Sequence, residues 1–244
     1  MNNNELPSVF VGTMHTQEGD FLKSMQQIQA QEGVIVTHFI VSGMKEKAAH
    51  NALWHAWKDQ RENHELFVKI DADTVLMEKN TLAEIVKLFR DNPRVTGLQA
   101  PLHDYMTDDH INGLNVFSPK VTFNDTQDEL YCDRQVDTDH DIVLRGTSLP
   151  QSLVPAGLHC HHANECQAFH YGVHRSLKGQ KHVIDKVMLA WQRDQDRIRG
   201  FALIGASMSG MFAQHRRFNY SDPEFKSAFE QASACYDQMV KVWK

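Results

Sequence analysis

The sequence predicts an α/β fold in which a mainly parallel sheet is flanked by helices. Apolar, β-branched segments over 7–15, 34–43 and 66–76 alternate with segments whose apolar residues recur at helical intervals. Strands and helices that alternate in this way form βαβ units with parallel strands. The 244 residues, of which 41% are hydrophobic and 23% charged, also have the composition of a globular protein with a sizeable core.

The elements of the front half, residues 1–102, follow from these apolar patterns. We expect strands over 7–15, 34–43, 66–76 and 94–102, and helices over 20–32, 46–60 and 80–93. In each helix the apolar residues recur every three or four positions, so that they share one face. Thr81 and Glu84 have the spacing of a capping box at the start of the last of these helices.

The back half, residues 103–244, is expected to complete a site that the front half begins. It starts as a polar, acidic and irregular stretch with strand-like pieces at 113–117 and 120–123, followed by strand fragments over 141–175. Helical periodicity returns over 182–198 and 224–243. No flexible linker separates the halves, so we expect a single domain over 1–244, with a smaller mixed region and C-terminal helices behind the parallel sheet.

Charge and hydropathy exclude some classes of function. The formal net charge of -6 and the lack of a dense Lys/Arg run disfavour nucleic-acid binding. The longest apolar stretch, 200–212, is too short to span a bilayer, and the N-terminus does not resemble a signal peptide, so we expect a cytoplasmic protein. The C-terminal segment 236–244 is amphipathic, which suits peripheral membrane contact, core packing or a dimer contact.

Two aspartates end the third predicted strand, in the stretch "VKIDADTVL". Alternate residues of a strand point to the same face, so Asp71 and Asp73 are expected to project together. Two neighbouring carboxylates repel each other unless a cation or a proton lies between them. Carboxylates together with substrate phosphates are the usual ligands of Mg²⁺ and Mn²⁺. The pattern therefore predicts a metal–diphosphate site at the carboxyl edge of the sheet, where ligands bind in open α/β folds. A similar spacing in "DTDHD" (137–141) is interpreted as a solvated loop.

Four segments in this order resemble the GT-A glycosyltransferases, especially those of the family 2 type: "VFVGTMH", "VIVTHFIVSG", "KAAHNALWHAW" and "VKIDADTVL". The resemblance implies a GT-A-like, Rossmann-type fold. It also implies transfer of a sugar from a nucleotide-diphosphate sugar to a saccharide or glycoconjugate acceptor, as in bacterial polysaccharide synthesis. Asp71 and Asp73 would hold Mn²⁺ or Mg²⁺ on the donor diphosphate.

The same resemblance implies which residues of the front half contact the donor. These are Thr13, Ser42, Asn51, Asp71 and Ala72. The chain departs from the family pattern in two places. Ser42 and Gly43 stand where many relatives have an acidic residue for the nucleoside, and His50 stands where an arginine is common.

Five of the 15 histidines lie between residues 159 and 174. By resemblance, a histidine of the second half completes the metal site, and His159 is the first candidate because it ends the apolar run "LVPAGLH". His161 is the second candidate, while His170 and His174 would contact phosphates or the acceptor. We expect Arg175 and Lys178 to neutralise the diphosphate, with a solvated surface as the alternative. A zinc site is another interpretation of this region, from Cys160, His161, His162, Cys166 and His170, although their spacing matches no closed zinc pattern.

A transfer that inverts the anomeric centre needs a carboxylate base for the acceptor hydroxyl. Asp104 and Asp109 follow the fourth predicted strand directly and are the favoured candidates. The other aspartates considered are Asp108, Asp133, Asp137, Asp139 and Asp141. A retaining mechanism without a dedicated base stays open.

Two other functions are alternatives to sugar transfer. A sugar-phosphate nucleotidyltransferase would have a Gly-rich loop with Lys or Arg after the first strand, and "GTMHTQEGDF" (12–21) contains neither cation. A non-catalytic nucleotide-sugar-binding protein is disfavoured because both Asp71 and Asp73 are present together with a candidate histidine.

Overall fold

The computed structural model describes residues 6–134, 136 and 142–243. The front half alternates strands and helices, as its apolar pattern predicts. Its elements are β1 (Ser8–His15), α1 (Phe21–Gln29), β2 (Ile35–Ser42), α2 (Glu46–Gln60), the short 3₁₀ helix η1 (Arg61–Asn63), β3 (Leu66–Lys69), β4 (Thr74–Leu76) and α3 (Thr81–Asp91). The strand predicted over 66–76 is therefore two short strands. The predicted capping box does not form, because the hydroxyl of Thr81 donates to the Glu78 carbonyl and the N-cap residue is Asn80.

The back half contains a β-hairpin, two short strands and four α-helices among the described residues. Its elements are β5 (Gly97–Asp104), β6 (Asp109–Phe117), η2 (Cys132–Arg134), β7 (Val143–Arg145), η3 (Gly146–Ser148), η4 (Gln151–Leu153), β8 (Gly157–His159), α4 (Glu165–Leu177), α5 (Lys181–Asp194), α6 (Arg197–Met208), η5 (Ser209–Phe212), α7 (Pro223–Val240) and η6 (Lys241–Trp243). The predicted C-terminal helices are confirmed. The prediction of strand fragments over 141–175 was wrong for its last part, which is α4.

In the described part of the chain, eight strands form one sheet in the order β2-β1-β3-β6-β5-β8-β4, and β7 pairs with β5. The sheet is mixed, which corrects the expectation of a mainly parallel one. β1 pairs in parallel with β2 and β3, as predicted, but β6 is antiparallel to both β3 and β5. The reason is the tight turn over 105–108, because strands joined by so short a connection must run antiparallel. Among the described strands, β4 pairs only with β8 and runs antiparallel to it.

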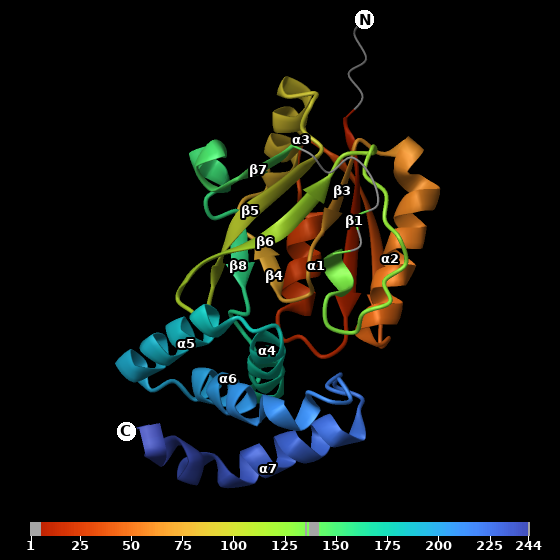
Figure 1. Ribbon diagram of the computed structural model, residues 1–244. Coiled ribbons are helices and arrows are strands. Elements are labelled where there is room, and N and C mark those ends of the chain that lie inside the picture. The colour runs from red at the N-terminus through yellow and green to blue at the C-terminus, as the bar shows by residue number, and fades with distance from the viewer. Residues whose placement is uncertain (1–5, 135, 137–141, 244) are drawn as a thin grey trace, which may run out of the picture.

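Helices cover both faces of the sheet (Figure 1). α1 and α3 pack on one face, where Val9, Val11 and Val68 point into a core cluster with Ile28 and Ile85. α2 packs on the other face, where the ring of Phe10 contacts Trp57 and that of Phe67 contacts Trp54 and Trp57, in a core cluster that also contains Leu53. Adjacent residues of β1 thus contribute to opposite cores, as the alternation of side chains along a strand requires.

A third core lies among α4, α5, α6 and α7, which gather beyond the carboxyl end of β1 (Figure 1). α4 and α6 approach each other closely through two glycines. A Cβ atom at Gly172 would overlap the Ala202 carbonyl oxygen, and one at Gly205 would overlap the Phe169 carbonyl oxygen. Glycine permits this contact because it has no side chain. The close packing holds α4, and with it the polar face of α4, against the end of the sheet.

The C-terminal helices show what the amphipathic segment 236–244 contacts. Trp243 meets Trp191 of α5 edge-on, with ring centroids 5.7 Å apart, so the packing alternative is confirmed for this tryptophan. None of the described helices combines the length and the apolar character that a bilayer crossing requires.

Candidate active site

The stretch Asp71–Asp73 forms a turn between β3 and β4, in which the Thr74 amide donates to the Asp71 carbonyl at 2.9 Å. Aspartate is disfavoured in strands, which accounts for the end of β3 at this point. The expectation that both carboxylates project from one strand face was therefore wrong. Both nevertheless line the same cavity, where they meet different partners.

Asp71 pairs with the ammonium group of Lys69, which lies almost fully buried at the end of β3. Burial alone would raise the pKa of Asp71, but the adjacent Lys69 charge outweighs this effect and lowers it. Burial would likewise lower the pKa of Lys69, and the carboxylate of Asp71 raises it instead. The two residues therefore form an ion pair in which both side chains are charged.

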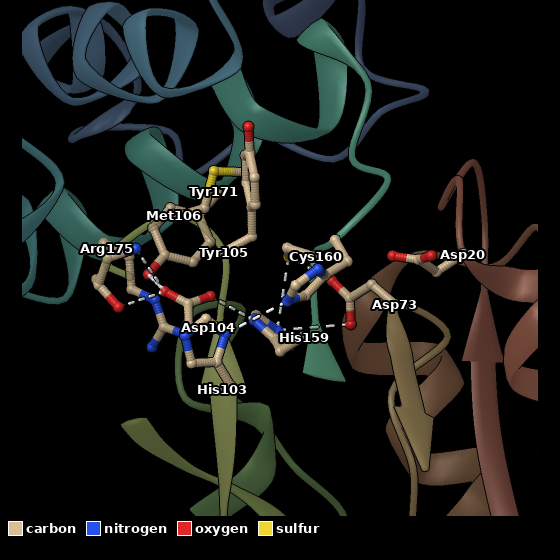
Figure 2. Close-up of polar contacts among 12 residues, drawn as sticks. Asp20, Asp73, His103, Asp104, Tyr105, Met106, His159, Cys160, Tyr171 and Arg175 are labelled. Carbon is tan, nitrogen blue, oxygen red and sulfur yellow. Dashed lines mark hydrogen bonds and ion pairs between the residues drawn. The ribbon is translucent and has the colours of Figure 1, made fainter. Parts of the chain in front are cut away.

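Asp73 faces His159, and behind His159 lies Asp104 (Figure 2). His159 Nε2 lies 3.5 Å from Asp73 Oδ1, and His159 Nδ1 lies 2.7 Å from Asp104 Oδ1. Asp104 is completely buried, and its other oxygen accepts hydrogen bonds from the Thr107 amide, the Thr107 hydroxyl and the Tyr171 hydroxyl. Asp104 thus orients the imidazole toward Asp73.

The two carboxylates determine the protonation of His159. Burial would lower the pKa of His159, but Asp73 and Asp104 outweigh it and raise the pKa to about 9. The same imidazolium, with Thr107, keeps the pKa of Asp104 below its ordinary value against the effect of burial. Without a metal, the charged histidine stabilises buried Asp104 on one side and half-buried Asp73 on the other.

Asp73, His159 and Cys160 could hold a metal ion. One ligand atom from each lies within 4.8 Å of the others. Asp73 Oδ2 accepts hydrogen bonds from Gln167 Nε2 at 3.0 Å and from Cys160 Sγ at 3.1 Å, whereas buried Asp73 Oδ1 has no hydrogen-bond partner. An orphaned carboxylate oxygen beside an imidazole nitrogen fits a divalent cation. The burial of Cys160 raises the pKa of its thiol well above the ordinary value, which favours its role as a donor to Asp73.

The cavity beside this cluster has a volume of about 260 Å³ and lies beyond the carboxyl ends of β1 and β3. This is the edge at which α/β sheets bind ligands. Its acidic lining residues are Glu18, Glu46, Asp71, Asp73 and Asp133, its basic ones are Lys69, Arg175 and Lys178, and its histidines are His15, His50, His159, His170 and His174. The cavity thus offers both metal ligands and cationic groups for an anionic ligand.

Arg175 and Lys178 reach this cavity from the end of α4, so the alternative of a fully solvated surface does not hold for them. The Arg175 guanidinium lies 4.9 Å from the centroid of the Tyr171 ring and donates to Gln180 Oε1 at 3.1 Å. Partial burial lowers the pKa of Lys178. The Lys178 ammonium lies 5.6 Å from the centroid of the Tyr131 ring.

The other four histidines of the 159–174 region differ in whether they line the cavity. His170 and His174 line the cavity, and burial lowers the pKa of His170 to about 4 and that of His174 well below the ordinary value, so both are neutral. His161 instead contacts His103 at 3.3 Å, and His162 contacts Asp20 at 2.6 Å. The zinc interpretation of this region was wrong, because no metal-ligand group found among the described residues contains more than one of its five candidates.

Three of the residues implied as donor contacts lie outside the cavity lining. Thr13 is buried and its hydroxyl pairs with His38 Nε2 at 2.9 Å. Asn51 points toward Thr126, whose amide donates to Asn51 Oδ1 at 2.8 Å. Ser42 is exposed at the end of the edge strand β2. Of the front-half donor residues, Asp71 and Ala72 do line the cavity.

Neither favoured candidate for the base lines the cavity. Asp104 is enclosed behind His159, and Asp109 is exposed and pairs with Lys186 at 2.6 Å. Asp108 pairs with Arg193 at 2.7 Å. Asp133 does line the cavity, whereas Asp137, Asp139 and Asp141 lie outside the described residues.

Sequence reasoning missed several residues of the cavity. Lys69 could have been recognised from the sequence, because a lysine inside an apolar strand next to an acidic motif predicts a buried ion pair. Glu46 lies in the first turn of α2, and burial raises its pKa to about 7 against the opposing effect of Lys178 and Lys69. Glu18 and Gln167 reach the site only through the tertiary fold and carried no local signal.

Comparisons with known proteins give only distant likenesses. No protein-family model matches the sequence, and no curated protein matches it. The structure is similar to that of a mannosyltransferase from Pyrobaculum calidifontis in complex with GDP-Man and Mn²⁺, at 13% identity and a TM-score of 0.37, covering 98% of this chain and 85% of that one. It is also similar to a glycosyltransferase involved in the glycosylation of the major capsid of PBCV-1, at 11% identity and a TM-score of 0.32, covering 46% of this chain and 60% of that one.

Proposed function

We propose that this protein is a metal-dependent glycosyltransferase that moves a sugar from a nucleotide-diphosphate sugar to an acceptor hydroxyl. The observation that carries the proposal is the meeting of Asp73 and His159 in a cavity that also holds Arg175 and Lys178. Carboxylate and imidazole ligands beside cationic side chains suit a divalent ion bound to a diphosphate. The sequence resemblance to GT-A glycosyltransferases of the family 2 type supports the same reaction.

In this proposal Asp73 and His159 hold Mn²⁺ or Mg²⁺, and the ion stabilises the charge that develops on the leaving diphosphate. Asp104 acts through His159. Its carboxylate accepts a hydrogen bond from Nδ1 of His159, so that Nε2 is free to bind the metal. Arg175 and Lys178 bind the diphosphate oxygens, since both are cations within the cavity. Asp71 is balanced by Lys69 and contacts the donor together with Ala72.

An inverting transfer would require a base near the acceptor. Because Asp104 is enclosed and Asp109 is ion-paired at the surface, we propose that neither removes the acceptor proton. The cavity carboxylates outside the Asp71–Asp73 turn are Glu18, Glu46 and Asp133, so these are the acids to test.

A single domain over 1–244 is supported by strands of both halves sharing one sheet. A saccharide or glycoconjugate acceptor and a cytoplasmic location belong to the same proposal.

Release of nucleoside diphosphate from a panel of nucleotide sugars tests this function. We expect Mn²⁺-dependent release by the wild-type protein and its loss in Asp73→Asn. Asp109→Asn is the matched control, since it removes an equal charge from a surface ion pair. Full activity in Asp73→Asn would remove the metal assignment. If no nucleotide sugar were turned over and no nucleoside diphosphate bound, the transferase proposal would fail.

A further inference from the structure

A second cluster of metal-ligating side chains lies beside the same cavity and does not include the Asp71–Asp73 turn. A carboxylate oxygen of Glu46, a ring nitrogen of His50 and the thiol of Cys132 all lie within 4.8 Å of one another. Glu46 and His50 lie one turn apart on α2, and Cys132 begins η2. The cluster therefore joins two segments that are distant in the sequence.

The hydrogen bonding of His50 prepares it as a ligand. Its Nδ1 lies 2.9 Å from the backbone carbonyl of Glu46, which can only accept, so Nδ1 carries the hydrogen. Its Nε2 is then a lone-pair acceptor, is buried, and has no hydrogen-bond partner. A metal-bound histidine commonly donates its second ring N–H to a backbone carbonyl in this way. An unpaired buried acceptor costs free energy that a bound cation would recover.

His174 of α4 lies next to this group of three residues and approaches it through Glu46. Its imidazole interacts with the backbone of Leu130, and its buried Nε2 has no hydrogen-bond partner. This Nε2 lies 3.9 Å from Glu46 Oε1, too far for a hydrogen bond but close enough for both atoms to share one ion. The cluster and His174 thus contain two buried imidazole nitrogens that have no hydrogen-bond partner.

The charges around the cluster permit a cation there. Lys69 and Lys178 are the positive groups that act on Glu46, and Asp71 and Asp133 are the negative ones. Lys69 is already paired with Asp71. The negative charge of Asp133 stabilises the positive charge of Lys178 and raises its pKa. The lysine charges are therefore offset by acids outside the cluster.

We propose that Glu46, His50, Cys132 and His174 form a zinc site. One thiolate, two imidazoles and one carboxylate are four ligands of the types that Zn²⁺ binds in tetrahedral sites. On binding, Cys132 would release the hydrogen that it now donates to the Asp128 carbonyl at 3.0 Å. The ion would cross-link η2 to α2 and α4 through its ligands, and would thereby stabilise one wall of the cavity. The proposal does not depend on sugar transfer, but a zinc-bound Glu46 could not act as the base, which leaves Glu18 and Asp133 as the cavity acids for that role.

Metal binding by the full-length protein tests this site. Protein stripped with a chelator is titrated with Zn²⁺ in competition with a chromophoric chelator, and bound zinc is counted by mass spectrometry. We expect one tightly bound zinc ion per chain, and a loss of affinity greater than about 100-fold in Cys132→Ser and in His50→Gln. Cys235→Ser, on α7, is the matched control and should bind zinc as the wild type does.

Cobalt substitution identifies the thiol that binds. Co²⁺ should give a thiolate charge-transfer band that is absent in Cys132→Ser and present in Cys160→Ser, which removes the thiol of the Asp73 cluster. The absence of this band in the wild type would overturn the proposal, and this result does not require that Cys132→Ser folds. A band that is lost in Cys160→Ser and kept in Cys132→Ser would also overturn it, as would equal zinc affinity in the wild type, Cys132→Ser and His50→Gln.

Discussion

His159 Nδ1 lies 2.7 Å from the buried carboxylate of Asp104, and this contact directs His159 Nε2 toward Asp73. Replacing Asp104 with Asn removes the charge but preserves the size of the side chain. We expect the affinity for Mn²⁺ to fall about 10–100-fold, because a histidine ligand loses the partner that orients it. Isothermal titration with Mn²⁺ measures this change. Asp109→Asn should bind Mn²⁺ as the wild type does, and an equal loss in both variants would contradict a specific role for Asp104.

The raised pKa of His159 predicts how the stability of the metal-free protein depends on pH. The pKa rises from 6.5 in the unfolded chain to about 9 in the folded one, so the folded state binds the proton more tightly. The resulting stabilisation, on the order of 3 kcal/mol, is fully present below pH 6.5 and is lost as the pH rises through 9.

Urea unfolding in the presence of a chelator, between pH 6 and 10, measures this dependence. His159→Gln is the comparison variant, because glutamine keeps a hydrogen-bond donor and does not titrate. The free energy of unfolding should fall more steeply with pH in the wild type than in His159→Gln. Parallel pH profiles for the two proteins would show that His159 is not the group responsible.

The ion pair of Lys69 and Asp71 predicts a thermodynamic coupling. Lys69→Met leaves Asp71 without its cation, and Asp71→Asn leaves a buried ammonium group unpaired. Each single variant should lose stability, and the double variant should lose less than the sum of the two. A double-mutant cycle from urea denaturation should give a coupling of about 0.5–3 kcal/mol. Strict additivity would contradict a direct interaction.

The close approach of α4 and α6 predicts that Gly172 cannot carry a side chain. In Gly172→Ala the new Cβ would overlap the Ala202 carbonyl oxygen, so that the helices must separate. We expect a loss of about 1–3 kcal/mol in the free energy of unfolding. Gly210→Ala is the control, because a Cβ there meets nothing within 4 Å. The prediction fails if thermal unfolding shows both variants to be as stable as the wild type.

The first βαβ units could be predicted from the sequence because their apolar residues alternate or recur at helical intervals. The turn after β5 was harder to predict, since "YMTD" has neither Gly nor Pro, and its one turn-favouring feature is Asp108, a residue type that tolerates the positive φ of 50° found there. That turn reverses the chain and makes the sheet mixed. α4 was missed because it contains histidines and a central glycine, Gly172, which are weak helix formers.

In the candidate site, the acidic motif and His159 could be recognised from the sequence, but the arrangement of their partners could not. The alternation rule applies only within a strand, and Asp71 and Asp73 lie on a turn. Asp104 is a candidate base in the sequence because it follows a predicted strand. That position does not indicate whether its side chain is buried. The inward position of Glu46 depends on how α2 packs, which the sequence alone does not determine.

Binding of nucleoside diphosphates in the presence and absence of Mn²⁺ tests the central claim most directly. Calorimetric titration of GDP, UDP and CDP would be carried out on the wild type, Asp73→Asn and Asp109→Asn. The account predicts that at least one of the three binds the wild type and Asp109→Asn only when Mn²⁺ is present, and that Asp73→Asn loses this binding. Metal-independent binding, or binding that Asp73→Asn retains in full, would contradict it.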